Sequence, residues 1–359
     1  MQPTQSDHQP LIFDNRDFSR YTDGDRRMSM RGFEPQYTDI VDYIIRITHK
    51  IWEEKAVGYI YDTYQHNCVV HGSGGDVHGR EAVVASTLQT LAAFPDRKLY
   101  GDNVIWSGDE DAGFHTSHLI TSVGYNTGYS SYGPPTGRRI TSRAIANCVS
   151  KENMIFEEWL LRDETSLIRQ LGYDVFDVAE RQVRSAPAMP LEGGGELGRA
   201  LGQLPPPIMP PSTADGFDVE DFVRRSYHDI WNRRLLNKIR EHYVPSYVCY
   251  TAGGRKYQGP AEQIAFVLGL FGMFPDAGVT VDHVYWNGDD ASGYQVAVRW
   301  RLSGTHTGYG RYGEPSGSRV SIMGLSQHHV KQGKFVLEYT LFDEMELIRR
   351  IVAERLVRS

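Results

Sequence analysis

Apolar residues recur at helical spacing ahead of each group of strand-like segments. In residues 41–64, VDYIIRITHKIWEEKAVGYIYDTY, they return every three or four positions, which predicts an amphipathic helix. A second helix is predicted at 79–94, GREAVVASTLQTLAAF, and a corresponding one at 259–274, GPAEQIAFVLGLFGMF. Short helices are also expected to begin at Asp163 and Asp343.

Apolar and alternating runs separated by turns predict strands. They lie at 103–108, 114–124, 138–149 and 154–161 in the first half, and at 283–288, 294–304, 318–330 and 334–342 in the second. Helices followed by consecutive strands are typical of an α+β fold. We therefore expect helices to cover one curved antiparallel sheet in each half.

The two halves of the chain repeat one another. TGYSSYGPPTGRR at 127–139 returns as TGYGRYGEPSGSR at 307–319, and FPD at 94–96 returns at 274–276, both at an offset of 180. Solenoid repeats are only about 20–50 residues long, so this repeat indicates a duplicated domain. The chain is interpreted as two copies of one fold.

Composition divides the chain into four segments. Residues 1–37 are polar and are predicted to form a loose arm. The first domain is predicted at 38–182 and the second at 217–359, joined by a Pro- and Gly-rich linker at 183–216. We expect the copies to form an intramolecular pseudo-dimer, and further homo-oligomerisation is left open.

Bulk properties agree with a soluble globular protein. The chain has 359 residues, 40% of them apolar, and a net charge of −7. Without a basic stripe, nucleic acid is not expected as a partner, and no apolar run approaches the ~18 residues that a membrane helix needs. Cys68, Cys148 and Cys249 match neither a disulfide framework nor a zinc motif. The N-terminal segment has no apolar signal region, so a cytoplasmic location is expected.

Several short motifs follow one another in a recognisable order. GREA at 79–82 and AFPD at 93–96 occur in the first copy, and the second copy contains VAVRW, GTHTG, PSGSRV and GKFVLEYTLFD. These motifs resemble the SnoaL-like polyketide cyclase family of the nuclear-transport-factor-2-like superfamily, whose domains are cone-shaped α+β barrels. The resemblance covers nearly all of both domains. It is more specific for the fold than for the reaction, because this fold carries many chemistries.

The resemblance implies a pocket inside each cone and a carboxylate that acts as general acid/base, with no cofactor and no metal. The carboxylate position falls on Asp163 and Asp343. The family's cyclases also carry a Gln and a His, sixteen and fourteen residues before this Asp. The second copy has Gln327 and His329 at those positions, whereas the first has Asn147 and a valine.

Strand alternation predicts which side chains share the face of these aspartates. In the first copy they are Ile155, Glu157, Trp159 and Leu161, with Arg139, Thr141, Arg143, Ile145, Asn147 and Val149 across the hairpin. Trp159, its counterpart Tyr339, Glu157, Asn147 and Gln327 are candidate substrate contacts. An apolar setting raises the pKa of a carboxyl group, which suits proton transfer near neutral pH. Both aspartates can instead serve only as helix N-caps.

The first copy carries ionisable groups that the second lacks. His71 lies where the family often lines its pocket, and Arg143 replaces Met323 of the second copy. A buried arginine needs an anionic partner, and either Glu157 or a substrate anion fits. Because a dense set of ionisable groups is hard to explain by packing, the first copy is favoured as the active one.

Histidines and loop tyrosines complete the candidate set. His115 and His118 have opposite strand parity, so at most one faces the pocket, and His118 is taken as the candidate substrate contact. Tyr125 and Tyr129 lie on or beside the repeated loop, where they either pack structurally or stack on an aromatic ligand.

Together these features predict a cofactor-independent enzyme that uses general acid/base catalysis for C–C bond chemistry on a small aromatic or polyketide-like molecule. An aldol or retro-aldol lyase, including one that releases formaldehyde, and a cyclase both use that chemistry. An isomerase or dehydratase with the same carboxylate, and a non-catalytic binding or scaffold protein, are the alternatives.

Overall fold

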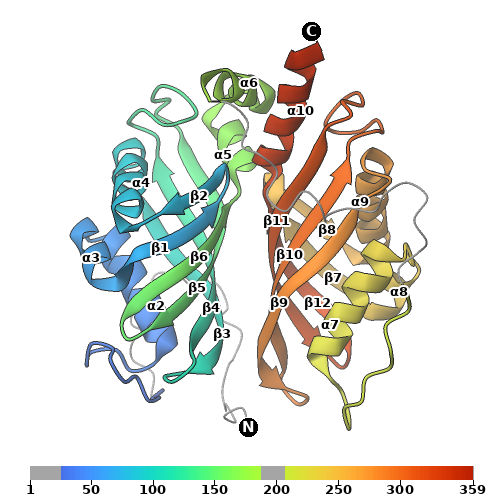
Figure 1. Cartoon of the computed structure of the whole chain (residues 1–359), viewed down its shortest axis with the longest axis horizontal. Coiled ribbons are helices and arrows are strands. Elements are labelled where there is room, and N and C mark those ends of the chain that lie inside the picture. The colour runs from blue at the N-terminus through green and yellow to red at the C-terminus, as the bar shows by residue number, and fades with distance from the viewer. Residues whose placement is uncertain (1–25, 187–206, 359) are drawn as a thin grey trace. The chain divides into compact units, whose positions relative to one another are not determined.

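The computed structural model describes residues 26–186 and 207–358 of the chain. The chain divides into two compact units between Asp174 and Val175, which we call the first and second domains. Each contains a six-stranded sheet with helices packed against it, and the strand order is the same in both (Figure 1). The prediction of two α+β domains of one fold is confirmed.

The elements of the first domain are α2 (Ile40–Trp52), η1 (Val57–Tyr59), α3 (Ile60–Thr63), β1 (Tyr64–Gly72), β2 (Gly75–His78), α4 (Arg80–Ala93), β3 (Lys98–Asp109), β4 (Gly113–Tyr125), β5 (Arg139–Lys151), β6 (Met154–Arg162) and α5 (Glu164–Leu171). In this domain, helices α2, η1, α3 and α4 precede the long strands β3 to β6. The sheet order is β2-β1-β6-β5-β4-β3.

The second domain repeats this arrangement after one additional helix. Its elements are α6 (Val175–Ser185), α7 (Val219–Tyr227), η2 (His228–Asn232), α8 (Lys238–His242), β7 (Tyr243–Thr251), η3 (Ala252–Gly254), β8 (Arg255–Gln258), α9 (Gly259–Met273), β9 (Gly278–Asp289), β10 (Gly293–Thr305), β11 (Arg319–Lys331), β12 (Lys334–Phe342) and α10 (Glu344–Arg358). The sheet order is β8-β7-β12-β11-β10-β9.

One strand pair in each sheet is parallel. β1 runs parallel to β6 and β7 runs parallel to β12, while the other neighbours are antiparallel. The predicted all-antiparallel sheet is therefore wrong at this pair. The short hairpin of β1 and β2 was not predicted, because half-exposed and polar residues interrupt the apolar pattern of β1.

The first helix is shorter than its apolar pattern predicts. The Asp39 side chain caps α2 by accepting a hydrogen bond from the Asp42 backbone N–H at 2.7 Å. Isoleucines 40, 44, 47 and 51 then bury one stripe of the helix. Lys55 adopts a φ of 63°, which a continuing α-helix does not allow, and β1 begins at Tyr64.

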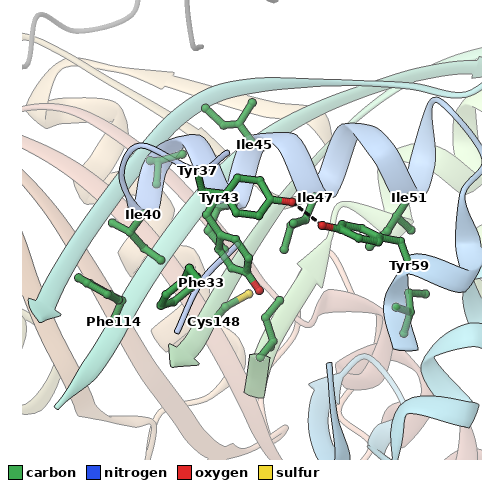
Figure 2. Packing of buried hydrophobic residues seen from close by; sticks show 14 of the residues in the cluster. Phe33, Tyr37, Ile40, Tyr43, Ile45, Ile47, Ile51, Tyr59, Phe114 and Cys148 are labelled. Carbon is green, nitrogen blue, oxygen red and sulfur yellow. Dashed lines mark hydrogen bonds between the residues drawn. The ribbon is translucent and has the colours of Figure 1, made fainter. Parts of the chain in front are cut away.

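Part of the predicted N-terminal arm belongs to the core of the first domain. Phe33 packs edge-on against Tyr43 and Phe114, with ring centroids 4.9 and 5.9 Å away (Figure 2). The hydroxyls of Tyr37 and Tyr59 are hydrogen-bonded at 2.6 Å, also shown in Figure 2. The prediction of a loose arm is therefore wrong for residues 33–37, while residues 1–25 lie outside the described part.

The domain boundary predicted at 182 falls inside α6. This helix packs against α10 of the second domain, where the Arg349 guanidinium donates a hydrogen bond to Gln182 Oε1 at 3.2 Å. Most of the predicted linker at 183–216 lies outside the described residues.

The repeated turns are part of the scaffold. Asp96 Oδ1 accepts a hydrogen bond from the backbone N–H of Tyr125 at 2.8 Å, and Asp276 Oδ1 accepts one from Thr305 at 2.7 Å. A Cβ on Gly128 would lie 2.0 Å from the carbonyl oxygen of Ala92, so only glycine fits there. Close packing explains why both copies keep these residues.

Candidate active site

A cavity of about 260 Å³ lies in the first domain, lined by helices α2 and α4 and by strands of the sheet. This is the volume of roughly nine water molecules at ~30 Å³ each, enough for one small organic molecule. Much of the wall is aliphatic, with Ile44, Ile47, Ile51, Val70, Val83 and Ile120. The polar and ionisable lining residues are Thr48, Tyr64, Ser73, Ser86, Thr87, Arg97, His118, Cys148, Glu158, Arg162 and Glu164.

Glu158 provides a buried carboxyl group in the cavity wall. Its side chain projects from β6, and the Tyr64 hydroxyl donates a hydrogen bond to Oε2 at 3.0 Å. Burial raises the pKa of Glu158, although the Tyr64 hydrogen bond and the positive charge of Arg162 each lower it in part. A buried carboxyl group with a raised pKa is suited to act as a general acid or base.

A β-bulge in β6 brings Ile155 onto the same cavity-facing side as Glu158. Val149 pairs with Glu157 and Ser150 pairs with Ile155, so Phe156 is an extra residue without a partner on β5. Beyond the bulge, Glu158, Leu160 and Arg162 line the cavity, together with Ala144, Ala146 and Cys148 of β5. Asn147 pairs with Trp159 and Val149 pairs with Glu157, so these residues share one face of the hairpin as predicted, but the opposite face lines the cavity.

His118 faces the cavity from β4, as the sequence analysis allowed for one of the two histidines. It is 3% exposed, and burial lowers its pKa to about 4, so the imidazole is neutral at pH 7. Within the described residues its Nε2 has no hydrogen-bond partner. A Cβ at Gly101 would lie 2.8 Å from this nitrogen, so the absence of a side chain there leaves room for the ring.

Two arginines line the same cavity. Arg97 directly precedes β3, is 9% exposed, and donates a hydrogen bond from Nε to Ser122 Oγ at 2.8 Å. Its guanidinium lies 4.8 Å from the ring centroid of Trp52. Arg162 is the last residue of β6 and is half-buried. The cavity wall therefore carries two guanidinium groups as well as the carboxyl groups of Glu158 and Glu164.

Asp163 and Asp343 occupy helix N-cap positions and line neither cavity. Asp163 Oδ1 accepts a hydrogen bond from the Ser166 backbone N–H at 3.2 Å, and Asp343 Oδ1 accepts one from Glu346 at 2.9 Å. Each aspartate therefore caps the helix that follows it.

Several predicted site residues of the first copy form a separate cluster. His71 Nδ1 lies 2.7 Å from Asp76 Oδ1, and its Nε2 lies 2.9 Å from Glu157 Oε1. The imidazole also stacks on Trp159, with ring centroids 5.1 Å apart. These residues, with Arg143 and Asn147, are absent from the cavity lining, and Tyr125 and Tyr129 are 47% and 78% exposed.

The predicted residues of the second copy are likewise placed away from its cavity. Tyr339 stacks on Tyr250 with ring centroids 5.1 Å apart, at the positions that correspond to Trp159 and His71. Gln327 and His329 are on β11 and do not line the cavity, whereas the intervening His328 does.

The cavity of the second domain is only about 40 Å³. Aromatic side chains replace smaller ones at three positions, Tyr227 for Thr48, Phe266 for Ser86 and Trp300 for Ile120, and Phe342 replaces Arg162. Aromatic packing therefore fills the space that remains open in the first domain.

Glu338 of this second cavity is held in a hydrogen-bonded network. The Tyr247 hydroxyl donates to Glu338 Oε2, and the neighbouring His328 Nε2 is hydrogen-bonded to the Tyr227 hydroxyl at 2.9 Å. Burial raises the pKa of Glu338 to about 7 and lowers that of His328 to about 3. The same carboxyl position is thus satisfied by protein groups in a nearly filled interior.

A protein-family model described as SnoaL-like polyketide cyclase matches residues 43–171 and 221–351, once in each domain and over more than half of the chain. The chain belongs to the SnoaL-like polyketide cyclase family. Cyclase-type chemistry is therefore the activity that the family suggests.

Solved structures resemble one SnoaL-like domain at a time. A protein from Jannaschia sp. CCS1, described as a SnoaL-like polyketide cyclase, is 24% identical with a TM-score of 0.34, over 37% of this chain and 91% of that one. AclR of Streptomyces galilaeus, described as a hydroxylase, is 24% identical with a TM-score of 0.32, over 37% and 93%. TsrD of Streptomyces laurentii is 18% identical with a TM-score of 0.33, over 38% and 99%. No curated protein matched the sequence.

The described part of this SnoaL-like chain was searched for metal-binding clusters and for membrane-spanning helices. Residues 26–186 and 207–358 contain no cluster of three or more His, Cys, Asp or Glu side chains arranged to hold a metal ion. Within the same ranges, no helix is both long and apolar enough to cross a membrane.

Sequence reasoning missed Glu158, Arg97 and Arg162. A signal for the arginines was available, because the second SnoaL-like domain has Ala277 and Phe342 at the corresponding positions. Glu158 could have been found from its identity with Glu338 in the other copy. Its orientation was missed because the pocket face was assigned from Asp163, which does not line the cavity.

Proposed function

We propose that the first domain is a cofactor-independent enzyme in which Glu158 acts as general acid/base in aldol-type C–C bond chemistry. The observation that carries this proposal is a buried carboxyl group with a raised pKa on the wall of an open, largely apolar cavity. The family's cyclase description supports the reaction class.

Proton transfer at Glu158 accounts for both halves of an aldol cyclisation. The Glu158 carboxylate takes the proton from a carbon next to a carbonyl group, and the enolate carbon then forms a bond to a second carbonyl carbon. The alkoxide produced takes the proton back from Glu158. No net proton or electron is consumed, so atoms and charge balance without a co-reactant. On a β-hydroxy ketone, the reverse steps are a retro-aldol cleavage: the alcohol gives its proton to Glu158, the C–C bond breaks to give an enolate and an aldehyde such as formaldehyde, and the enolate carbon takes the proton back.

The surrounding groups support this cycle. The charge of Arg162 lowers the cost of ionising Glu158, and the Tyr64 hydroxyl orients its carboxylate. Positive charge from Arg97 and Arg162 favours the enolate and alkoxide oxygens as they become negative. His118 is neutral and can exchange a hydrogen bond with a substrate oxygen through the unpartnered Nε2.

A small aromatic or polyketide-like ketone is the proposed substrate class. Isoleucines of α2 and the indole of Trp52 supply an apolar wall, while the ionisable groups gather on the strands and at Arg97. The second domain, with its cavity of about 40 Å³, is proposed to be a partner without turnover.

A turnover screen against polyketide-like ketoesters and lignin-type diaryl diols tests the assignment. Glu158→Gln should lower kcat by about a hundredfold or more, the usual contribution of a general acid/base. Glu338→Gln is the matched control at the same position of the second domain and should retain turnover. Full activity in a folded Glu158→Gln protein, or loss only in Glu338→Gln, would overturn the proposal.

A further inference from the structure

Arg97 is a buried cation with an incomplete set of partners. Its Nε bonds to Ser122, and its guanidinium lies over Trp52, but among the described residues it forms no ion pair with Asp or Glu. Burial and the nearby charge of Arg162 both lower the pKa of Arg97. Burying a charge without an opposite charge is costly, so a site of this kind favours an anion.

Arg162 adds a second guanidinium to the same cavity. Within the described residues it too has no Asp or Glu at ion-pair distance, although Glu158 and Glu164 line the cavity with it. Two neighbouring guanidinium groups repel one another, and an anionic group that contacts both offsets this repulsion. Carboxylates suit this role, because guanidinium groups form forked, charge-assisted hydrogen bonds to them.

We infer that the first-domain cavity takes a small organic monoanion whose carboxylate contacts Arg97 and Arg162. This inference rests on the proposed function in one respect: it names the substrate class of the same cavity. A monoanion fits better than a dianion such as phosphate, because Glu158 and Glu164 already place carboxyl groups beside the arginines.

The second domain serves as an internal comparison. Ala277 stands at the position of Arg97, and Phe342 at that of Arg162. Neither residue can neutralise an anion, and the cavity there is nearly filled. Anion binding is therefore expected in the first domain alone.

Calorimetric titration of the full chain with benzoate, phenylacetate and acetoacetate, each beside its neutral methyl ester, tests the inference. At least one carboxylate should bind about tenfold or more tightly than its ester, the difference expected for bonds to a charged group. Arg97→Ala and Arg162→Phe, which install the second domain's residues, should each remove that preference. Arg169→Ala removes an exposed arginine outside the lining and should leave it unchanged.

Esters that bind as tightly as their acids, or a preference that survives in both arginine variants, would overturn the inference. Tighter binding of inorganic phosphate would overturn the monoanion assignment. If circular dichroism shows that Arg97→Ala does not fold, the preference for the carboxylate over its ester is measured in Arg97→Lys and Arg162→Phe instead. Glu158→Gln should still bind the carboxylate, so failure of the catalytic proposal and failure of this inference give different results.

Discussion

The indole nitrogen of Trp300 donates a hydrogen bond to Ser326 Oγ, 2.9 Å away, where the first domain has Ile120 and Ala146. The Trp300 ring lies against Gly324, whose Cβ, if present, would come within 2.1 Å of the indole. The second domain has thus accommodated a large ring by losing a side chain on the next strand. This substitution contributes to the difference between cavities of about 260 and 40 Å³.

Filling the first-domain cavity with a tryptophan in the same way should impair substrate turnover. Ile120→Trp is expected to lower kcat/KM by about tenfold or more, because the larger ring occupies space meant for substrate. Trp300→Ile is the reciprocal variant and should leave turnover intact while costing about 2 kcal/mol of stability from the cavity it creates. Steady-state kinetics and denaturant unfolding measure both effects, and unchanged kinetics in a folded Ile120→Trp protein would contradict the cavity assignment.

The pH dependence of kcat/KM should report the titration of Glu158. Because the base must be ionised and burial raises its pKa, activity is expected to fall as the pH drops below a midpoint above 4.5. Arg162→Phe should move that midpoint upward, since it removes a charge that lowers the pKa. A midpoint at or below 4.5, or one that Arg162→Phe leaves unchanged, would argue for another base.

Asp163 is expected to act on stability through its helix cap. Asp163→Ala should destabilise the protein by about 1 kcal/mol, whereas Asp163→Ser retains a capping oxygen and should lose less. Both variants should keep kcat near the wild-type value. Denaturant unfolding and kinetics separate the two roles, because a catalytic carboxylate would be inactivated by serine as much as by alanine.

Glu338→Gln should stabilise the second domain increasingly as the pH rises. Burial raises the pKa of Glu338 from 4.5 to about 7, so the folded state keeps a proton that the unfolded chain has lost between these values. The contribution of protonated Glu338 to the free energy of unfolding is fully present below pH 4.5. It is lost as the pH rises through 7, by about 3 kcal/mol at most. A glutamine at this position does not titrate, so its contribution to the free energy of unfolding does not change with pH.

Hydrogen exchange of β11 and β12 peptides at several pH values measures this difference. Because His328 and Tyr247 are present in both proteins, their contributions largely cancel in the comparison. A difference between variant and wild type that stays constant from pH 5 to 8 would show that Glu338 is already ionised without penalty.

The fold could be predicted from the sequence more completely than the positions of the site residues. The offset between TGYSSYGPPTGRR and TGYGRYGEPSGSR predicted the duplication, and close packing at Gly128 and Gly308 explains why those turns are alike. The parallel pairing of β1 with β6 was missed, because pairing across the sheet depends on contacts distant in sequence.

The orientation of site residues depended on details that alternation cannot supply. The pocket face was assigned from Asp163, which caps α5 and does not line the cavity, and a change of one position exchanges the two faces of a strand. Glu158 therefore faces the cavity, while Glu157 pairs with His71 elsewhere. The sequence analysis favoured the first domain on His71, Arg143 and Glu157, none of which lines its cavity. The differences between the copies at 97 and 162, which the sequence analysis did not use, lie in the cavity wall.

The most direct test of the central claim is deuterium exchange at the substrate carbon next to its carbonyl group, followed by NMR in D₂O. The wild-type protein should exchange that hydrogen with a bound ketone, and Glu338→Gln should do so equally well. A folded Glu158→Gln protein should exchange it no faster than buffer alone. Exchange at the wild-type rate in Glu158→Gln would show that another group moves the proton, and the assignment of Glu158 as acid/base would be wrong.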